Sequence, residues 1–177
     1  TAPEPSGEGV ARAMRQALAE GGFTPEDLGH LNAHGTGTPA NDATESKALL
    51  ALCGEEAGSR IPVTSVKGTT GHTLGAAGAI EAIVTALSVM NDCVPPTAGF
   101  AEADPECPVS VVIEAKTGYP QKVALSNSLG FGGHERELGR FAVSRIGWEE
   151  PNHGHRIPLR QGRRRGGAAA SRPRSAG

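Results

Sequence analysis

Three stretches of the chain place apolar residues at the three- and four-residue spacing that is typical of helices. They cover residues 6–22, 41–56 and 74–90. Ser6 is expected to cap the first helix, and Asn41 or Asp42 the second, because short polar side chains accept free N–H groups at a helix start. The paired glycines at 21 and 22 are expected to end the first helix.

The third of these helices is apolar on nearly all sides, which predicts that it is buried on most of its surface. Its expected packing stripe consists of Ile80, Ile83, Val84 and Leu87. Short runs rich in apolar and β-branched residues predict four strands, at residues 30–33, 61–66, 109–114 and 122–126. A short helical start at Thr24–Asp27 carries proline at its first helical position. The alternation of helices and strands predicts an α/β fold with a layered core.

Glycine-rich polar loops follow three of the predicted strands, and sites in α/β folds are commonly built at strand ends. These loops supply His34, then Lys67 and His72, then Phe131 and His134. A neutral imidazole can donate a hydrogen bond to a developing oxyanion or move a proton near pH 7. Taken singly, each histidine could equally be a structural hydrogen-bonding residue, Lys67 a solvated charge and Phe131 a core residue. None of the loops matches a nucleotide-binding fingerprint.

Composition argues against a membrane span and a cysteine metal site, and it shows an uneven distribution of charge along the chain. No run of 18 apolar residues is present, which indicates no membrane span, and the three cysteines have no metal-binding spacing. A reducing, cytoplasmic location is therefore expected. Residues 1–134 carry four Lys, three Arg and fifteen Asp or Glu, whereas residues 135–177 carry ten Arg, no Lys and four Glu. Such a division is typical of an attached basic tail.

Four sequence blocks resemble the C-terminal half of β-ketoacyl-acyl carrier protein synthases, in order and in spacing. The blocks are Asn32–Pro39 with Asn41, Asp42 and Glu45; Val63–Lys67 with Gly71–Gly78; Pro95–Thr97; and Asn127–His134. The resemblance covers residues 1–134 and is to the elongating, Cys-His-His type. It implies a thiolase-like fold, of which this chain would hold the C-terminal α/β layered half. A thiolase proper is a less fitting alternative, because the block Asn32–Thr38 is a signature of the decarboxylating branch.

The resemblance also implies residue roles. His34 and His72 would be the active-site histidines, Lys67 the active-site lysine and Glu45 its ion-pair partner. Thr36 and Thr38 would bind the phosphopantetheine arm, and Phe131 would be the gating phenylalanine. The implied reaction is decarboxylative condensation of acyl groups with malonyl-acyl carrier protein in fatty acid or polyketide synthesis. No metal or nucleotide cofactor is expected, because the substrates arrive on the phosphopantetheine of acyl carrier protein.

The family's nucleophilic cysteine has no counterpart here, since Cys53, Cys93 and Cys107 lie in unsuitable settings. The expected partners are therefore the N-terminal half of the same domain, acyl carrier protein, and a second copy or a related subunit, with neither nucleic acid nor membrane. The alternative is a catalytically inactive fragment or a non-catalytic chain-length-type partner subunit.

Residues 135–177 depart from the family pattern and are expected to form a separate Arg/Gly-rich tail, disordered or translated out of frame. One permitted choice of codons, read after loss of a single base at codon 135, gives the apolar ending typical of the family and then a stop. The competing interpretation is a genuine disordered basic arm.

Overall fold

The computed structural model describes residues 4–130 and 139–144, all within one unit that spans Thr1–Gly147. Its main sheet has five strands in the order β4-β2-β1-β6-β7. The first four strands are parallel to one another, and β7 runs antiparallel to β6. The five strands are β1 (Leu28–Asn32), β2 (Pro62–Thr64), β4 (Ser110–Val111), β6 (Val123–Ser128) and β7 (Gly139–Ser144). A separate antiparallel pair consists of β3 (Cys93–Val94) and β5 (Lys116–Thr117).

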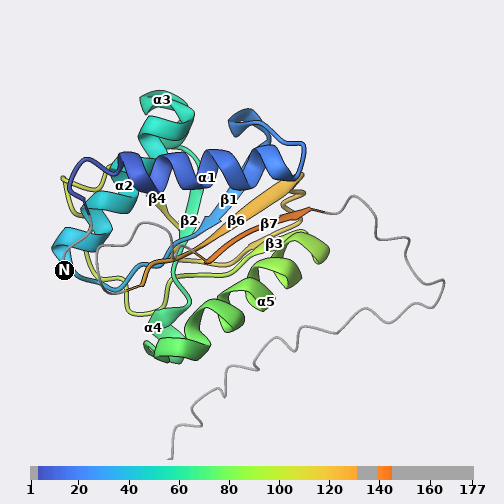
Figure 1. Ribbon diagram of the computed structural model, residues 1–177. Helices are drawn as coiled ribbons and strands as arrows, with labels where there is room; N and C mark the ends of the chain where they lie inside the picture. The colour runs from blue at the N-terminus through green and yellow to red at the C-terminus, as the bar shows by residue number, and fades with distance from the viewer. Residues whose placement is uncertain (1–3, 131–138, 145–177) are drawn as a thin grey trace, which may run out of the picture. The chain divides into compact units, whose positions relative to one another are not determined.

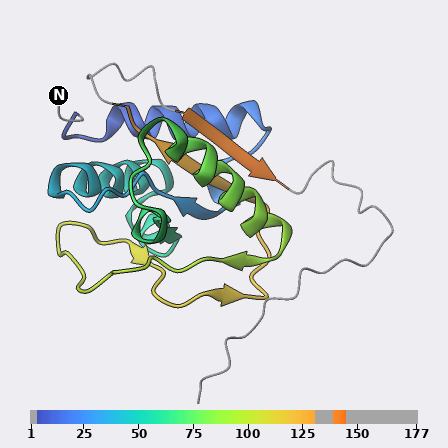
Figure 2. The same ribbon diagram turned by 90° about the horizontal axis from the view of Figure 1, so that it is seen from below.

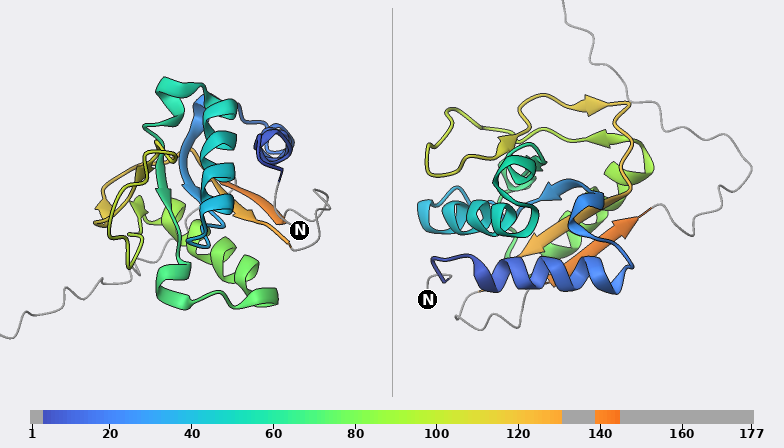
Figure 3. Two further views of the ribbon diagram at one scale, coloured as in Figure 1. Left: turned by 90° about the vertical axis from the view of Figure 1, so that its left-hand side faces the viewer. Right: turned by 90° about the horizontal axis from the view of Figure 1, so that it is seen from above.

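Helices cover both faces of the sheet (Figure 1). The longer ones are α1 (Glu8–Glu20), α2 (Pro39–Cys53) and α5 (Ala77–Met90). The shorter ones are η1 (Pro25–Asp27), α3 (Glu55–Gly58), α4 (Lys67–Thr70) and η2 (Leu74–Ala76). Helices α1 and α2 lie together on one face and α5 lies on the other (Figure 3). The predicted α/β layered architecture is confirmed.

The first helix shows how packing changes a helix start. The N-cap is Gly7 and not Ser6, although the Ser6 hydroxyl accepts the N–H of Glu8 at 3.2 Å. Gly7 has a φ of 73°, and a Cβ there would lie 2.7 Å from the Thr44 carbonyl oxygen on α2. Only glycine permits this close approach of α1 to α2.

The second helix begins earlier and ends earlier than predicted. Thr38 is the N-cap and Pro39 occupies the first helical position, where its fixed φ suits a helix and its missing N–H is not needed. The Asn41 side chain, expected as a cap, donates instead to Asp42 and Glu45. Gly54, at φ 81°, ends α2 and separates α3 from it.

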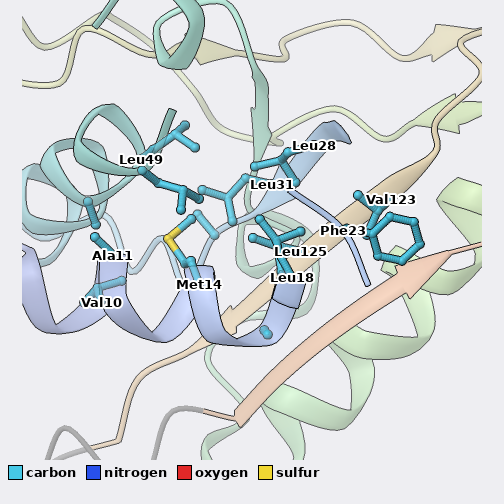
Figure 4. Packing of buried hydrophobic residues seen from close by; sticks show 14 residues of the cluster. Val10, Ala11, Met14, Leu18, Phe23, Leu28, Leu31, Leu49, Val123 and Leu125 are labelled. Carbon is cyan, nitrogen blue, oxygen red and sulfur yellow. The ribbon is translucent and has the colours of Figure 1, made fainter. Parts of the chain in front are cut away.

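Between α1, α2 and the sheet lies a continuous hydrophobic cluster (Figure 4). Leu18 and Leu49 are completely buried, and Leu31 of β1 and Leu125 of β6 meet them from the sheet. Burying one such side chain contributes roughly 1.5–3 kcal/mol. This face therefore holds the main hydrophobic core of the described residues.

The opposite face is covered by α5, which crosses β6 and β7 (Figure 2). The predicted packing stripe of this helix is only partly right: Ile80 and Val84 are half-buried, but Ile83 is 61% exposed and Leu87 is 44% exposed. The buried positions are Ala77, Glu81, Thr85, Ser88 and Val89. Three of these five are polar, because β1 presents His30 and Asn32 to this helix and polar side chains must meet polar partners.

The C-terminal boundary also differs from expectation at one place. Gly139–Ser144, within the segment expected to be a tail, forms β7 and pairs with β6 over six residues. The remaining residues of the predicted tail, 135–138 and 145–177, lie outside the described ranges. The out-of-frame hypothesis rests largely on these residues.

Candidate functional site

The predicted site residues come together where the parallel strands β1 and β2 end. Asn32 and Thr64 are register partners at the ends of these strands. His34 follows β1 by two residues, and Lys67 begins α4 just after β2. Both turns therefore open at the same edge of the sheet, and the sequence prediction of a common loop cluster matches this placement.

Glu45 on α2 holds the turn that carries His34. Its Oε1 accepts the backbone N–H of His34 at 2.8 Å and the Asn127 amide at 3.1 Å. Its Oε2 accepts the N–H of Gly35 at 2.8 Å and the Asn41 amide at 2.9 Å. Burial raises the pKa of the Glu45 carboxyl, and the four donors oppose that shift because they favour the ionised form.

Lys67 is buried and makes an ion pair with Glu81 of α5, not with Glu45. The expected pairing is therefore corrected. The reason is geometric: both oxygens of Glu45 are occupied by the donors of the His34 turn, whereas Glu81 faces inward from α5. Burial raises the pKa of Glu81, and the adjacent Lys67 ammonium acts against that rise.

His34 accepts from Lys67 and lies edge-on to His72. The Lys67 Nζ is 3.2 Å from His34 Nδ1, and the two imidazole centroids are 5.2 Å apart with an interplanar angle of 84°. Burial, reinforced by Lys67 and His72, lowers the pKa of His34 to about 4. The imidazole is therefore neutral near pH 7, and because Nδ1 accepts from the ammonium its proton lies on Nε2.

His72 is exposed and has the same tautomer. Its Nδ1 accepts the backbone N–H of Leu74 at 3.2 Å, which leaves Nε2 to carry the proton of the neutral ring. The site thus presents two imidazole Nε2–H donors beside a buried ammonium group. Such a set suits an oxygen atom on which negative charge develops.

Thr36 and Thr38 lie on the turn between His34 and α2. Their hydroxyls bond to each other at 2.8 Å, and Thr36 borders a cavity of about 910 Å³ that also reaches Lys67 and His72. The segment Thr97–Asp104 forms another wall of this cavity. Phe131 lies outside the described residues.

Sequence reasoning gave no role to two residues that shape this site, although Asn32 belongs to the block around His34. Asn32 donates to the Glu81 carbonyl at 3.1 Å and to the Thr85 hydroxyl at 3.0 Å, which attaches α5 to β1. Glu81 was not singled out, although a lone acid in an otherwise apolar helix was a usable signal: buried carboxylates need a partner.

The three cysteines do not supply a nucleophile to this cluster. The Cys53 sulfur lies 3.9 Å from the Pro25 carbonyl oxygen, and Cys93 belongs to β3. Cys107 borders the cavity, but burial and the nearby Asp104 and Asp42 raise its thiol pKa to about 11. A thiol with such a pKa is a poor nucleophile near neutral pH.

Two other features, a metal-binding cluster and a membrane-spanning helix, are absent from the described part of the chain. No cluster of three or more His, Cys, Asp or Glu side chains is arranged to hold a metal ion. Across residues 4–130 and 139–144, no helix combines the length and apolarity that crossing a bilayer requires.

Comparison with known proteins gives consistent matches. A family model described as beta-ketoacyl synthase, C-terminal domain, matches residues 1–101. The chain is 47% identical over 138 residues to 3-oxoacyl-[acyl-carrier-protein] synthase 2 of Synechocystis sp., covering 78% of this chain and 33% of that protein. The same protein of Staphylococcus aureus strain COL gives the same identity and coverage. The chain thus spans about a third of the length of these curated relatives.

Solved structures agree with these sequence matches. A beta-ketoacyl synthase from Burkholderia phymatum is similar at a TM-score of 0.66 and 37% identity, over 75% of this chain and 31% of that one. A type II PKS ketosynthase, solved in complex with its acyl-carrier protein, is similar at a TM-score of 0.70 and 36% identity, over 75% and 32% of the two chains. These neighbours confirm the expected thiolase-like α/β fold. The chain belongs to the beta-ketoacyl synthase family and carries that family's C-terminal domain.

Proposed function

We propose that this chain is the C-terminal part of a 3-oxoacyl-acyl carrier protein synthase, an acyltransferase of fatty acid or polyketide synthesis. The observation that carries the proposal is the pair of imidazole Nε2–H donors on His34 and His72 beside the buried Lys67 ammonium. The reaction is a decarboxylative Claisen condensation that extends an acyl chain by two carbons.

His34 and His72 act on the malonyl thioester. Loss of carbon dioxide leaves an enolate, and the negative charge on its oxygen is stabilised by the two Nε2–H donors. Lys67 keeps the proton of His34 on Nε2 because its ammonium occupies Nδ1. The enolate carbon then attacks the acyl thioester, a carbon–carbon bond forms, and the thiolate leaves.

The acyl-bearing cysteine belongs to the N-terminal half of the domain, since the cysteines of this chain lie away from the histidines or have a raised thiol pKa. The outward apolar side of α5, with Ile83 and Leu87, supports packing against that half. Covering such a surface with another part of the protein removes apolar area from water.

The substrate carrier is acyl carrier protein, whose phosphopantetheine arm is bound by Thr36, which borders the cavity, and by Thr38, whose hydroxyl bonds to that of Thr36. One similar structure contains a ketosynthase with its acyl-carrier protein, and another contains a ketosynthase with its chain length factor. These support acyl carrier protein and a related subunit, or a second copy, as the partners of the parent enzyme. The parent is a cytoplasmic enzyme.

The direct test is to mix the purified chain with malonyl-acyl carrier protein and to measure acetyl-acyl carrier protein by mass spectrometry. We expect decarboxylation without condensation, and we expect His34→Ala and His72→Ala each to lower its rate by about 10²-fold or more, the usual loss on removing an oxyanion donor. Ser59→Ala is the matched control, because Ser59 caps the C-terminus of α3 and its hydroxyl donates to the Glu56 carbonyl. A rate that is unchanged in both histidine variants would refute the assigned roles.

The second candidate is a non-catalytic chain-length-type partner subunit or an inactive fragment. It is favoured by one similar structure, which is a ketosynthase/chain length factor. Absence of decarboxylation by the folded chain is the result that supports it.

A further inference from the structure

Gly35, the residue that follows His34, is held from two sides. The N–H of Gly35 donates to Glu45 Oε2 at 2.8 Å, and its carbonyl oxygen accepts the Ser65 hydroxyl at 2.8 Å. Gly35 has a φ of +43°, and a Cβ there would lie 2.6 Å from the Ser65 Cβ. The turn can approach Ser65 this closely only because residue 35 is glycine.

Ser65 is bonded on its other side to a third segment of the chain. Its backbone N–H donates to the Thr97 hydroxyl at 3.1 Å, and the Thr97 N–H donates to the Val112 carbonyl at 2.7 Å. Gly68 adds a second constraint, because a Cβ there would lie 2.0 Å from the Ala98 carbonyl oxygen. Ser65 therefore connects the His34 turn, the β2–α4 turn and the segment that begins at Thr97.

The geometry of the His34–Lys67 contact depends on this connection. Lys67 follows Ser65 by two residues, so one end of the 3.2 Å contact is fixed on the same turn as Ser65. The other end, His34, precedes the Gly35 carbonyl that the Ser65 hydroxyl holds. Both ends of the contact are thus tied to one nearly buried serine, which is 9% exposed.

We propose that Ser65 is a positioning residue, whose hydroxyl keeps His34 Nδ1 facing Lys67 Nζ and thereby keeps the His34 proton on Nε2. This inference rests on the proposed function, since it matters only where Nε2–H is the working donor. The charged and titratable groups that face His34 are Lys67 and His72, with Glu45 on its backbone and Glu81 beyond Lys67.

The test measures how readily His34 is acylated by diethyl pyrocarbonate in the full chain, with each histidine located by tandem mass spectrometry. Only the neutral imidazole reacts, so the ratio of the rates at pH 5.5 and pH 8 reports the protonation of the ring. With the His34 pKa lowered to about 4, this ratio is close to one. In Ser65→Ala the released ring moves away from Lys67 toward water, its pKa rises toward the ordinary value, and the ratio falls by up to about tenfold.

Two further variants separate positioning from general loss of structure. Thr97→Val removes the acceptor of the Ser65 N–H at nearly constant volume and is expected to lower the ratio by a smaller factor, whereas Thr97→Ser retains the hydroxyl and the ratio. Ser59→Ala is the matched serine control, and the buried His30 is the internal control for folding. If Ser65→Ala does not fold, the Thr97 pair decides the question.

An unchanged His34 ratio in folded Ser65→Ala, or equal ratios in Thr97→Val and Thr97→Ser, would overturn the proposal. The assay uses no malonyl substrate, so its failure is distinct from failure of the proposed function. A chain that fails to decarboxylate malonyl-acyl carrier protein but shows the fall in ratio would refute the function and retain the positioning role.

Discussion

The two faces of the main sheet differ in the side chains that they bury: one face is apolar, and the other buries hydrogen-bonded polar groups. Toward α1 and α2 the sheet presents Leu31 and Leu125, and the space between is filled by apolar side chains (Figure 4). Toward α5 it presents His30 and Asn32. Helix α5 buries Thr85 and Ser88 against them and leaves Ile83 and Leu87 exposed. The first face is a continuous hydrophobic core. The second serves the site, because Glu81 on its buried side fixes Lys67.

This difference explains why the buried side of α5 could not be predicted from its sequence. A helix with apolar residues all round offers two possible packing sides, and hydrophobicity alone cannot select one. The strand beneath selects the side, because the amide of Asn32 and the imidazole of His30 need hydrogen-bonding partners once they are buried.

The largest expected effect is on the polar face. Glu81→Ala leaves the buried Lys67 ammonium without its carboxylate, and breaking such a pair costs about 3–5 kcal/mol of the free energy of unfolding. Urea denaturation followed by circular dichroism measures this loss. Replacing both partners, as Lys67→Met with Glu81→Leu, should cost much less, because no charge then remains buried.

Leu18→Ala on the apolar face is the matched control for that substitution. It should cost about 2–5 kcal/mol, from lost burial and the cavity left behind, and yet leave His34 acylation unchanged. A Glu81→Ala variant that loses less than Leu18→Ala and keeps the His34 acylation profile would show that the two faces do not differ in the way described.

The next effect is a dependence of stability on pH that arises on the α5 face. Burial lowers the pKa of His30 to about 4, so between pH 6.5 and 4 this side chain binds more protons in the unfolded chain than in the folded one. The free energy of unfolding therefore falls as the pH falls through this window, by about 3 kcal/mol from His30. His34, whose pKa is also lowered to about 4, adds to the loss in the same direction.

His30→Leu tests this contribution, since it replaces the titrating imidazole by an apolar side chain of similar size. The slope of unfolding free energy against pH, from urea titrations at several pH values, should become shallower between pH 6.5 and 4. An identical slope in the variant would mean that the pKa of His30 does not differ between the folded and the unfolded chain.

The smallest effect on stability is expected on the outward side of α5. Ile83→Glu with Leu87→Lys replaces two exposed apolar side chains by a pair at helical spacing, and the unfolding free energy should change by no more than about 0.5 kcal/mol. We expect the unaltered chain to be poorly soluble by itself, and the double variant to associate less in sedimentation velocity experiments. An unaltered chain that is monomeric and melts cooperatively would contradict this expectation.

Much of the site could be predicted from the sequence because its residues are local to recognisable turns. The block around His34 and the blocks around Lys67 and His72 each follow a strand, and parallel strands end at one edge of a sheet. The pairings inside the site could not be predicted. Glu45 and Glu81 are both acids on helices, and only their orientation shows that one holds backbone N–H groups while the other holds the lysine.

The ends of elements were set by contacts distant in sequence. The cap of α1 is Gly7, where the backbone of α2 passes too close for a side chain. Likewise, Gly139–Ser144 becomes a strand because the open edge of β6 offers a row of backbone partners, which an arginine-rich composition does not reveal.

The sequence by itself determined the family and the layered α/β class, and it pointed to the residues of the candidate site, because these depend on local motifs and periodicity. Only the tertiary structure decided which side of α5 is buried, which acid pairs with Lys67 and how Ser65 joins three segments. The physical reason is that burial obliges each polar group to find a partner. Which partner lies within reach depends on the packing of segments that are far apart in the chain.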